Sequence, residues 1–166
     1  MPEMLIRPAR EADLAALERR LPTGRNRYHD ARYARQIAGH GTYLLAFVGG
    51  EPIGHASLLW DGGHAEPVRA RFPGCPEINA LAVAAAWQSQ GIGTALIRAA
   101  ETLATQRGCR QIGLGVDDGN PRAAALYLRL GYRETDLHYM DFYHYTDETG
   151  RHEVADPCRF LIKQLA

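Results

Sequence analysis

The segment from Gln88 to Gly93, Gln-Ser-Gln-Gly-Ile-Gly, follows a strand-like run and opens a helical pattern. The first N–H groups of a helix have no acceptor within the helix, and together with the helix dipole they attract an anion. Glycine at positions 91 and 93 lets a phosphate approach the main chain because no Cβ intervenes, and Thr94 adds a hydroxyl group. The segment therefore predicts a phosphate-binding loop, with a plain glycine-rich helix cap as the alternative.

Two common nucleotide-binding loops do not match this segment. A Rossmann loop requires a third glycine three residues after the second, where this chain has Leu96. A Walker loop requires Gly-Lys-Ser or Gly-Lys-Thr, which is absent from the sequence. The anion is therefore expected to belong to a different phosphate-bearing ligand.

Three segments, in order, resemble the GCN5-related N-acetyltransferase (GNAT) superfamily. Gln88-x-x-Gly-x-Gly resembles the Arg/Gln-x-x-Gly-x-Gly/Ala motif that binds the pyrophosphate of acetyl-CoA in that family. Residues 77–83 resemble its fourth strand, and residues 120–132, Asn-x-x-Ala-x-x-x-Tyr-x-x-x-Gly-Tyr, resemble its second cofactor segment. The resemblance covers nearly the whole chain, although its specific motifs lie within residues 77–132.

The resemblance implies an α+β fold of mixed α/β character. The family fold has a central mixed, mostly antiparallel twisted sheet of six or seven strands, splayed between strands 4 and 5, with about four flanking helices and CoA in the cleft. We expect residues 1–166 to form a single N-acetyltransferase domain.

The resemblance also implies which residues bind acetyl-CoA, here a co-substrate. The main chain of Leu81 and Val83 would pair with the pantetheine arm, and main-chain amides from Gln88 to Thr94 would hold the pyrophosphate. Gln88 stands where arginine is frequent, so a charge-assisted contact is lost and the amides carry more of the binding. The expected CoA-binding residues are Leu81, Ala82, Val83, Gln88, Ser89, Gln90, Gly91, Ile92, Gly93, Thr94, Asn120, Ala123 and Tyr127.

Acyl transfer to an amine requires a base for the ammonium, donors for the developing oxyanion and a proton for the leaving thiolate. The resemblance assigns the acid role to Tyr127, with a core tyrosine as the alternative. It assigns the base role to Glu77, with a solvent-exposed carboxylate as the alternative, and Asn79 would orient water or substrate from the same strand face. The ordinary pKa of glutamate is about 4.3, so burial or a water relay would be needed. The oxyanion donor would be a main-chain N–H at Leu81 or Ala82.

Other titratable side chains give weaker hypotheses. Four histidines, which are His55, His64, His138 and His144, are rival bases. No spacing of His, Asp and Glu predicts a metal site, so no metal is expected. The three cysteines are widely spaced without a Cys-x-x-Cys motif, which argues against a zinc site or a disulfide framework.

The family resemblance places the acceptor opposite CoA, lined by residues 23–36, 61–75 and 138–156. Aromatic and mixed charged side chains there suit a primary amine on a small molecule or an amino-acid-like or peptide acceptor, with ordinary solvated surface as the alternative. A homodimer is a further expectation from the family. The residues expected to line the acceptor are Arg25, Tyr28, Trp60, Asp61, Arg69, Arg71, Tyr139, Asp141 and Tyr143.

Hydrophobic periodicity predicts the elements that position these residues. We expect a strand over 3–7, a helix around residues 14–21, a second helix within 23–42, a hairpin over 43–60, a long loop over 61–76, a strand over 77–83, a helix from about 91 to 108, a strand at 112–116, a helix from 121, and strands over 132–143 and 158–165 around a polar turn at 146–151. In the strand at 112–116, Gly113 and Gly115 leave one face without side chains, which allows close packing.

Composition excludes several classes of function. Nineteen Lys and Arg balance nineteen Asp and Glu, so no nucleic-acid footprint or polybasic membrane tether is evident. No signal-peptide core opens the chain, and no apolar run approaches the roughly 20 residues that span a bilayer. We therefore predict a cytoplasmic protein without nucleic-acid or membrane partners.

The sequence thus predicts an acyl-CoA-dependent N-acyltransferase that transfers acetyl to a primary amine by direct attack in a ternary complex. A non-catalytic CoA-binding or sensor module is one alternative. A helix cap in an unrelated α+β protein is the other.

Overall fold

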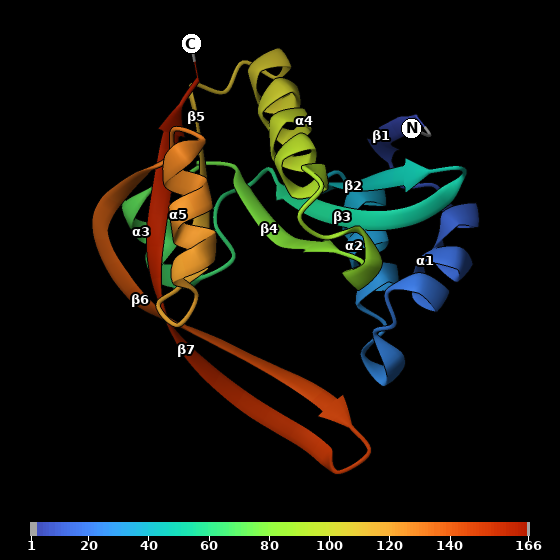
Figure 1. Cartoon of the computed structure of the whole chain (residues 1–166). Coiled ribbons are helices and arrows are strands. Elements are labelled where there is room, and N and C mark those ends of the chain that lie inside the picture. Colours follow the sequence, from blue (N-terminus) through green and yellow to red (C-terminus); the bar gives the residue numbers. More distant parts are fainter. Residues whose placement is uncertain (1–2, 166) are drawn as a thin grey trace. The chain divides into compact units, whose positions relative to one another are not determined.

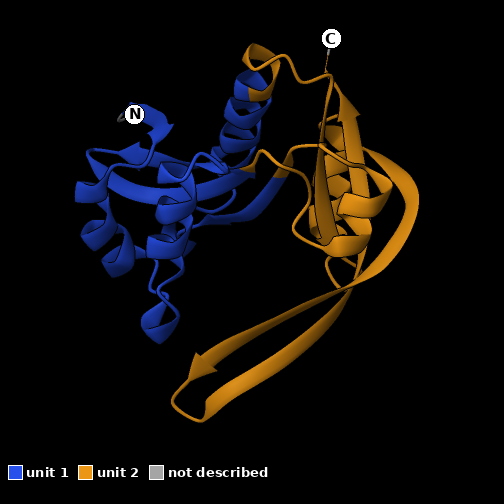
Figure 2. Ribbon diagram, turned by 180° about the vertical axis from the view of Figure 1, so that it is seen from behind, with its two compact units in different colours: residues 1–58, 78–103 blue, residues 59–77, 104–166 orange. Residues whose placement is uncertain are grey.

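The computed structural model describes residues 3–165 and contains, within them, seven strands, five α-helices and three short 3-10 helices (Figure 1). The chain forms two compact units: unit 1 is residues 1–58 with 78–103, and unit 2 is residues 59–77 with 104–166 (Figure 2). Of the seven strands, unit 1 holds the run β1-β2-β3-β4 apart from the end residues Leu59 and Glu77, and unit 2 holds the run β5-β7-β6.

Unit 1 contains the predicted N-terminal strand, two helices and hairpin. Strand β1 pairs antiparallel with β2, from Met4 opposite Val48 to Pro8 opposite Leu44. Gly49 and Gly50, with φ of 59° and 78°, form the two-residue turn between β2 and β3. Most of unit 1 is made by β1 (Met4–Pro8), α1 (Leu14–Arg20), α2 (Tyr28–Ile37), β2 (Gly41–Val48), β3 (Glu51–Leu59), β4 (Glu77–Val83) and α4 (Ile92–Gln106), with 3-10 turns at Glu11–Asp13, Gly24–Asn26 and Ala85–Trp87.

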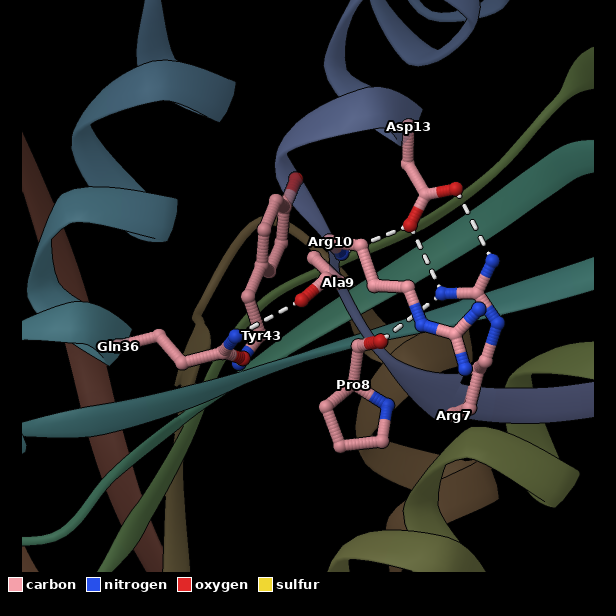
Figure 3. A network of polar contacts seen from close by, with 7 residues as sticks. All are labelled: Arg7, Pro8, Ala9, Arg10, Asp13, Gln36 and Tyr43. Carbon is pink, nitrogen blue, oxygen red and sulfur yellow. Dashed lines mark hydrogen bonds and ion pairs between the residues drawn. The ribbon is translucent and has the colours of Figure 1, made fainter.

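Hydrogen bonds connect the segment after β1 to α2 and β2 (Figure 3). The guanidinium of Arg7 donates to both carboxylate oxygens of Asp13, at 2.8 and 3.0 Å. Gln36 of α2 donates to the carbonyl of Ala9 at 2.9 Å and accepts from the N–H of Tyr43 at 2.8 Å. Gln36 therefore joins α2 to the main chain of two members of the buried cluster of Ala9, Leu17, Tyr43, Leu45 and Phe47.

Unit 2 is built on antiparallel strands. Strand β5 pairs with β7 from Gln111 opposite Gln164 to Asp117 opposite Cys158. Strand β6 pairs with the other edge of β7, with an irregularity between Glu134 and His138. Its elements are α3 (Glu66–Arg71), β5 (Gln111–Asp117), α5 (Pro121–Arg129), β6 (Arg133–Asp147) and β7 (Gly150–Gln164).

The final hairpin is longer than the sequence pattern predicts. The expected polar turn at 146–151 is confirmed in place but is narrower, because β6 and β7 pair as far as Asp147 opposite Gly150 and leave only residues 148–149 between them. Asp147 Oδ1 accepts the N–H of Thr149 at 2.8 Å and lies 2.9 Å from His152 Nε2, so side chains close the turn. The extended part of the hairpin is polar and largely exposed, which is why hydrophobic periodicity did not reveal it.

The segment 61–76, expected to be a loop throughout, contains the short helix α3 (Figure 1). Pro67 lies in the first turn of this helix, and Val68 is fully buried. A helix of six residues presents too few positions to show a helical period, so hydrophobic periodicity does not predict it.

The glycine face of β5 is packed as closely as the sequence predicts. A Cβ on Gly113 would stand 2.3 Å from Cζ of Phe160, and one on Gly115 would stand 2.1 Å from the hydroxyl of Tyr139. Phe160 is fully buried and stacks on Phe72, with ring centroids 5.5 Å apart. The rings of β6 and β7 residues therefore occupy the space that the glycines leave.

The predicted α+β fold class is confirmed, with seven strands and one more α-helix than the four expected, namely α3. The splay between strands 4 and 5 concerns how the two units are placed, so it stays a prediction. The prediction of a single domain over 1–166 also stays a prediction. Within residues 3–165, no helix is both long and apolar enough to cross a membrane.

Candidate active site

The predicted phosphate-binding loop lies in unit 1 between the end of β4 and the start of α4. A 3-10 turn over Ala85–Trp87 follows β4, and the chain then reaches Gly91, one residue before α4 begins. Ser89 and Gly91 both adopt positive φ, of 62° and 82°, which turns the main chain sharply into the helix. The side chain of Gln88 donates to the carbonyl of Val83 at 3.0 Å and so ties the loop back to the strand.

The two glycines of this loop leave open space around the start of α4. A Cβ at Gly91 or at Gly93 would meet no atom within 4 Å, so neither glycine is explained by close packing within the chain. Gly91 is required by its positive φ, whereas Gly93 has no such conformational reason. The main-chain N–H groups of the first helical turn have no acceptor within the helix. The loop therefore fits an anionic group that approaches the main chain closely.

Strand β4 leads into the loop and contains an unusual residue. Ala80 has φ of 54°, in the left-handed region that residues with a Cβ seldom adopt. The following residues, Leu81 to Val83, are half-buried. At the end of the strand, the N–H of Ala84 donates to the carbonyl of Ile53 in β3 at 2.8 Å. The oxyanion donor was expected at Leu81 or Ala82, and the structure places a left-handed residue directly before them.

The second predicted segment forms α5 in unit 2. Asn120 precedes the helix, and its side-chain oxygen accepts the N–H of Ala123 at 3.1 Å. Pro121 occupies the first helical turn, and Gly131 after the helix has φ of 98°. The predicted cap and helix are thus confirmed. Asn120 is exposed, and its contact with pantetheine stays a prediction.

Tyr127 lies on α5 with its ring packed edge-on to Tyr132, at a centroid distance of 6.4 Å. Burial raises the pKa of its phenol above the ordinary value of 10.0. The phenol is therefore protonated at neutral pH, which a proton donor requires, although a packed core tyrosine has the same property.

Glu77 opens β4 and is only 2% exposed, so the alternative of a solvated carboxylate is wrong. One of its oxygens, Oε2, accepts the N–H of His64 at 3.1 Å. The other, Oε1, would lie 3.2 Å from a Cβ on Gly63, so the segment before α3 packs directly against the carboxylate. Glu77 belongs to unit 2, with His64 and Gly63.

Three residues expected only to line the acceptor or to rival Glu77 gather near this carboxylate. Burial raises the pKa of the Tyr139 phenol, and the charges of Glu77 and Asp141 raise it further. His64 Nε2 lies 3.7 Å from Asp141 Oδ1, with both side chains partly exposed. Glu77, Tyr139, Asp141 and His64 are thus linked within unit 2 by one hydrogen bond, one ion pair and electrostatic interactions, and we call them the Glu77 cluster. Sequence reasoning named each residue but did not group them, because they come from separate segments.

Other residues expected at the acceptor have structural partners. The guanidinium of Arg107 lies 4.1 Å from the ring centroid of Trp60. Arg69 donates to the carbonyls of Gly63 and His64, at 3.1 and 2.5 Å, and so supports the segment beside Glu77. Their roles toward an acceptor, and those of Arg25, Tyr28, Asp61, Arg71 and Tyr143, stay predictions.

A separate groove of about 590 Å³ lies in unit 2, and of the segments expected to line the acceptor it contains only Phe72. It is lined by Phe72, Gln111, Gly131, Arg133, Glu134, Thr135, Ile162, Lys163 and Gln164. Within residues 3–165, the Glu77 cluster included, no three His, Cys, Asp or Glu side chains lie together as metal ligands would.

The predicted site residues are divided between the units. Unit 1 holds Asn79 and every expected residue from Leu81 to Thr94, on one continuous stretch of strand, turn and helix. Unit 2 holds Glu77, Asn120, Ala123 and Tyr127. The sequence did not predict the left-handed conformation of Ala80, because the amino-acid composition does not indicate a positive φ at an alanine.

A model of the acetyltransferase (GNAT) family matches residues 9–132 of the chain. Among curated proteins, mycothiol acetyltransferase of Amycolatopsis mediterranei is 39% identical over 101 residues, which are 58% of this chain and 32% of that protein. GCN5-related N-acetyltransferase 4, chloroplastic, of Arabidopsis thaliana is 40% identical over 71 residues, which are 43% of this chain and 24% of that protein. The matches thus span about a third or less of these relatives.

Solved structures show the same fold at lower identity. A ribosomal-protein-alanine N-acetyltransferase from Brucella melitensis has a TM-score of 0.70 and 23% identity, covering 97% of this chain and 99% of that chain. A GNAT family acetyltransferase from Elizabethkingia anophelis with acetyl-CoA bound has a TM-score of 0.65 and 21% identity, covering 98% of each chain.

Proposed function

Because the chain belongs to the acetyltransferase (GNAT) family, we propose that it transfers an acetyl group from acetyl-CoA to a primary amine. The observation that carries this proposal is the open main-chain loop at the start of α4, where a Cβ at Gly91 or Gly93 would meet nothing within 4 Å. The acetyl-CoA bound in a structural relative supports the identity of the donor.

Residues of unit 1 bind the donor in this proposal. The first N–H groups of α4 hold the pyrophosphate, since Gln88 offers no positive charge and is already bonded to Val83. The main chain of β4 from Leu81 through Ala82 to Val83 pairs with the pantetheine arm. A main-chain N–H directly after Ala80 stabilises the negative charge that develops on the acetyl oxygen.

Glu77 accepts the proton that the ammonium must lose before its nitrogen can attack. Its burial supports this role, because removal from water makes a carboxylate a stronger base. The Glu77 cluster offers an onward path for the proton, since Tyr139 lies within electrostatic range of the carboxylate and the His64–Asp141 pair is partly exposed. Asn79, half-buried on the same strand, orients the acceptor or a water molecule.

Tyr127 hydrogen-bonds to the departing sulfur or gives it a proton. Because burial raises its pKa, the phenol keeps its proton through the neutral range and is available as a donor. Asn120 and Ala123, at the start of the same helix, contact the pantetheine side.

The acceptor is a small molecule or an amino-acid-like or peptide amine that attacks directly in a ternary complex. Acidic and aromatic side chains near Glu77, namely Asp141 and Tyr139, suit a cationic amine. A homodimer and a cytoplasmic location stay predictions from the family and the composition.

The test is a steady-state assay of the purified chain with acetyl-CoA and a broad panel of amines, in which free thiol is measured. Turnover that depends on both substrates is expected, with Glu77→Gln and Tyr127→Phe slower than the parent. A thermal shift with CoA is the accompanying binding measurement, since a ligand at 100 times its Kd stabilises by about 2.7 kcal/mol. Binding without turnover across the panel would favour the CoA-sensor alternative, and no binding at millimolar CoA would overturn both.

A further inference from the structure

The left-handed conformation of Ala80 requires support from its surroundings. A residue with a Cβ is strained at φ of 54°, and such strain persists in a strand only where neighbouring groups fix it. Strand β3 supplies the neighbours. The carbonyl of Ile53 accepts from Ala84, and a Cβ on Gly54 would stand 3.2 Å from the carbonyl oxygen of Ala82.

His55, the next residue of β3, bonds to the main chain of Ala80. This bond favours the protonated ring, as expected when a ring N–H donates to a carbonyl oxygen. Nδ1 of His55 is buried without a hydrogen-bond partner, so the donor is Nε2. Burial, with a contribution from the charge of Arg32, lowers the pKa of the ring to about 3, so the imidazole is neutral and has one N–H to give.

A buried cluster in unit 1 holds the His55 ring in place. The ring of His29 contacts it edge-on at 5.2 Å between centroids, and the ring of Tyr43 lies 5.5 Å away. The hydroxyl of Tyr43 lies 2.6 Å from His29 Nδ1 and accepts from Arg32 at 3.2 Å. His55 is itself 5% exposed. Its orientation is therefore set by packing on several sides.

The peptide that joins Ala80 to Leu81 is trans, because the described chain has no cis peptide bonds. A trans peptide is planar, and its carbonyl and N–H point in opposite directions. A bond that fixes the carbonyl of Ala80 therefore also fixes the direction of the N–H of Leu81, which points away from His55.

We propose that His55 is a positioning residue, which aims the Leu81 N–H at the acetyl oxygen by holding the carbonyl of Ala80. This inference rests on the proposed function and chooses Leu81, rather than Ala82, as the oxyanion donor. The unpartnered Nδ1 agrees with a role beyond stability, because a buried acceptor without a partner destabilises a fold and an apolar residue would avoid it.

The experiment compares His55→Gln and His55→Leu with the parent chain. The amide nitrogen of glutamine reaches the position of Nε2 and can donate to Ala80, whereas leucine fills the space without a donor. The matched control is Ser57→Ala, a buried polar residue two positions along β3 on the same strand face. Melting temperature, kcat and KM for acetyl-CoA are measured for each variant with one amine from the panel.

We expect His55→Leu to keep its melting temperature and its KM for acetyl-CoA, while kcat falls about 10- to 100-fold through loss of a well-aimed oxyanion donor. His55→Gln should stay within about threefold of the parent kcat, and Ser57→Ala should leave kcat unchanged. A His55→Leu chain with the parent's kcat overturns the inference. So does a loss of kcat that follows the melting temperature in all three variants, since that marks a purely structural role.

A separate readout keeps this inference distinct from the proposed function. If the parent chain turns over no amine, the proposed function fails, and the amide resonance of Leu81 in a ¹⁵N–¹H spectrum then tests the positioning alone. That resonance should shift in His55→Leu and return in His55→Gln, with the Thr94 amide as an unmoved reference. An unchanged Leu81 resonance in His55→Leu contradicts the role of His55.

Discussion

The hydroxyl of Tyr139 lies 2.1 Å from the position that a Cβ on Gly115 would occupy, so the two residues share one space on the face of β5. Tyr139 comes from β6, and β7 lies between the two strands in the sheet order. The missing side chain of Gly115 therefore lets a phenol from β6 reach across to β5. This phenol belongs to the Glu77 cluster, so a packing feature of β5 helps to shape the candidate site.

Replacing Gly113 by alanine should destabilise the chain. Its Cβ would stand 2.3 Å from Phe160, a fully buried ring that stacks on Phe72 and has no space to withdraw. Overpacking of this kind costs about 1–3 kcal/mol. The free energy of unfolding in urea measures it. Gly115→Ala is the matched comparison and should cost less, because the hydroxyl end of the partly buried Tyr139 can move; equal costs for the two variants would contradict this account.

Gly93→Ala separates stability from donor binding. A Cβ at this position meets nothing within 4 Å, and alanine favours a helix over glycine by about 1 kcal/mol, so the melting temperature should hold or rise. The same Cβ enters the space proposed for the pyrophosphate, so KM for acetyl-CoA should rise about tenfold with kcat largely retained. An unchanged KM would show that the phosphate does not approach Gly93.

Tyr127→Phe should lower kcat about 100-fold while leaving the fold intact, because general acid catalysis contributes at least this much and the ring still packs on Tyr132. Tyr132→Phe, on the partner ring, is the control and should keep its kcat. The raised pKa of Tyr127 predicts that the parent chain loses no activity through this phenol until the pH exceeds about 10. A rate–pH profile that declines below that value in the parent, but not in Tyr127→Phe, would assign a different pKa to the residue.

Glu77→Gln tests the base. The amide oxygen can still accept from the N–H of His64, so stability should change by less than about 1 kcal/mol, while kcat falls about 100-fold or more. Asp141→Asn changes a carboxylate of the same cluster that is partly exposed, and it should lower kcat much less. If Asp141→Asn lowers kcat as much as Glu77→Gln, both carboxylates are needed and the assignment of the base to Glu77 alone is wrong.

The residues that follow from local pattern were predictable, and those that depend on contacts distant in sequence were not. Asn120 before Pro121 predicts a capped helix start, and the structure has it, because capping involves only neighbours. Gly113 and Gly115 likewise predicted that one face of β5 has no side chains of its own. Its occupants, Phe160 and Tyr139, come from 24 to 47 residues away, and nothing in local composition names them.

The site shows the same division. The turn between β4 and α4 follows from a local motif and was predicted from sequence, while its binding of phosphate stays a prediction. The burial of Glu77 depends on the fold of residues 63–68 around it, and the left-handed Ala80 depends on β3, so both required the structure. At Ala80, tertiary contacts override the preference of an ordinary residue for negative φ. The local sequence does not reveal such a conformation.

The pair of Arg7 and Asp13 should make stability depend on acid pH. The hydrogen bond from Arg7 is the main cause that lowers the pKa of Asp13 below its ordinary 3.8, and the N–H of Arg10 adds a bond of 2.7 Å to the same carboxylate (Figure 3). A carboxyl group whose pKa is lower in the folded chain contributes stability above its unfolded pKa, and this is lost as the pH falls through the folded value. Asp13→Asn should therefore cost about 1–3 kcal/mol at pH 6, and the difference from the parent should shrink as the pH falls below 3.8.

Urea unfolding of both chains from pH 6 to pH 2.5 measures this, with Asp136→Asn as the control, since the Asp136 side chain is 80% exposed in its ion pair with Arg71. A difference that stays constant across this range would mean that Asp13 stabilises the chain without its charge.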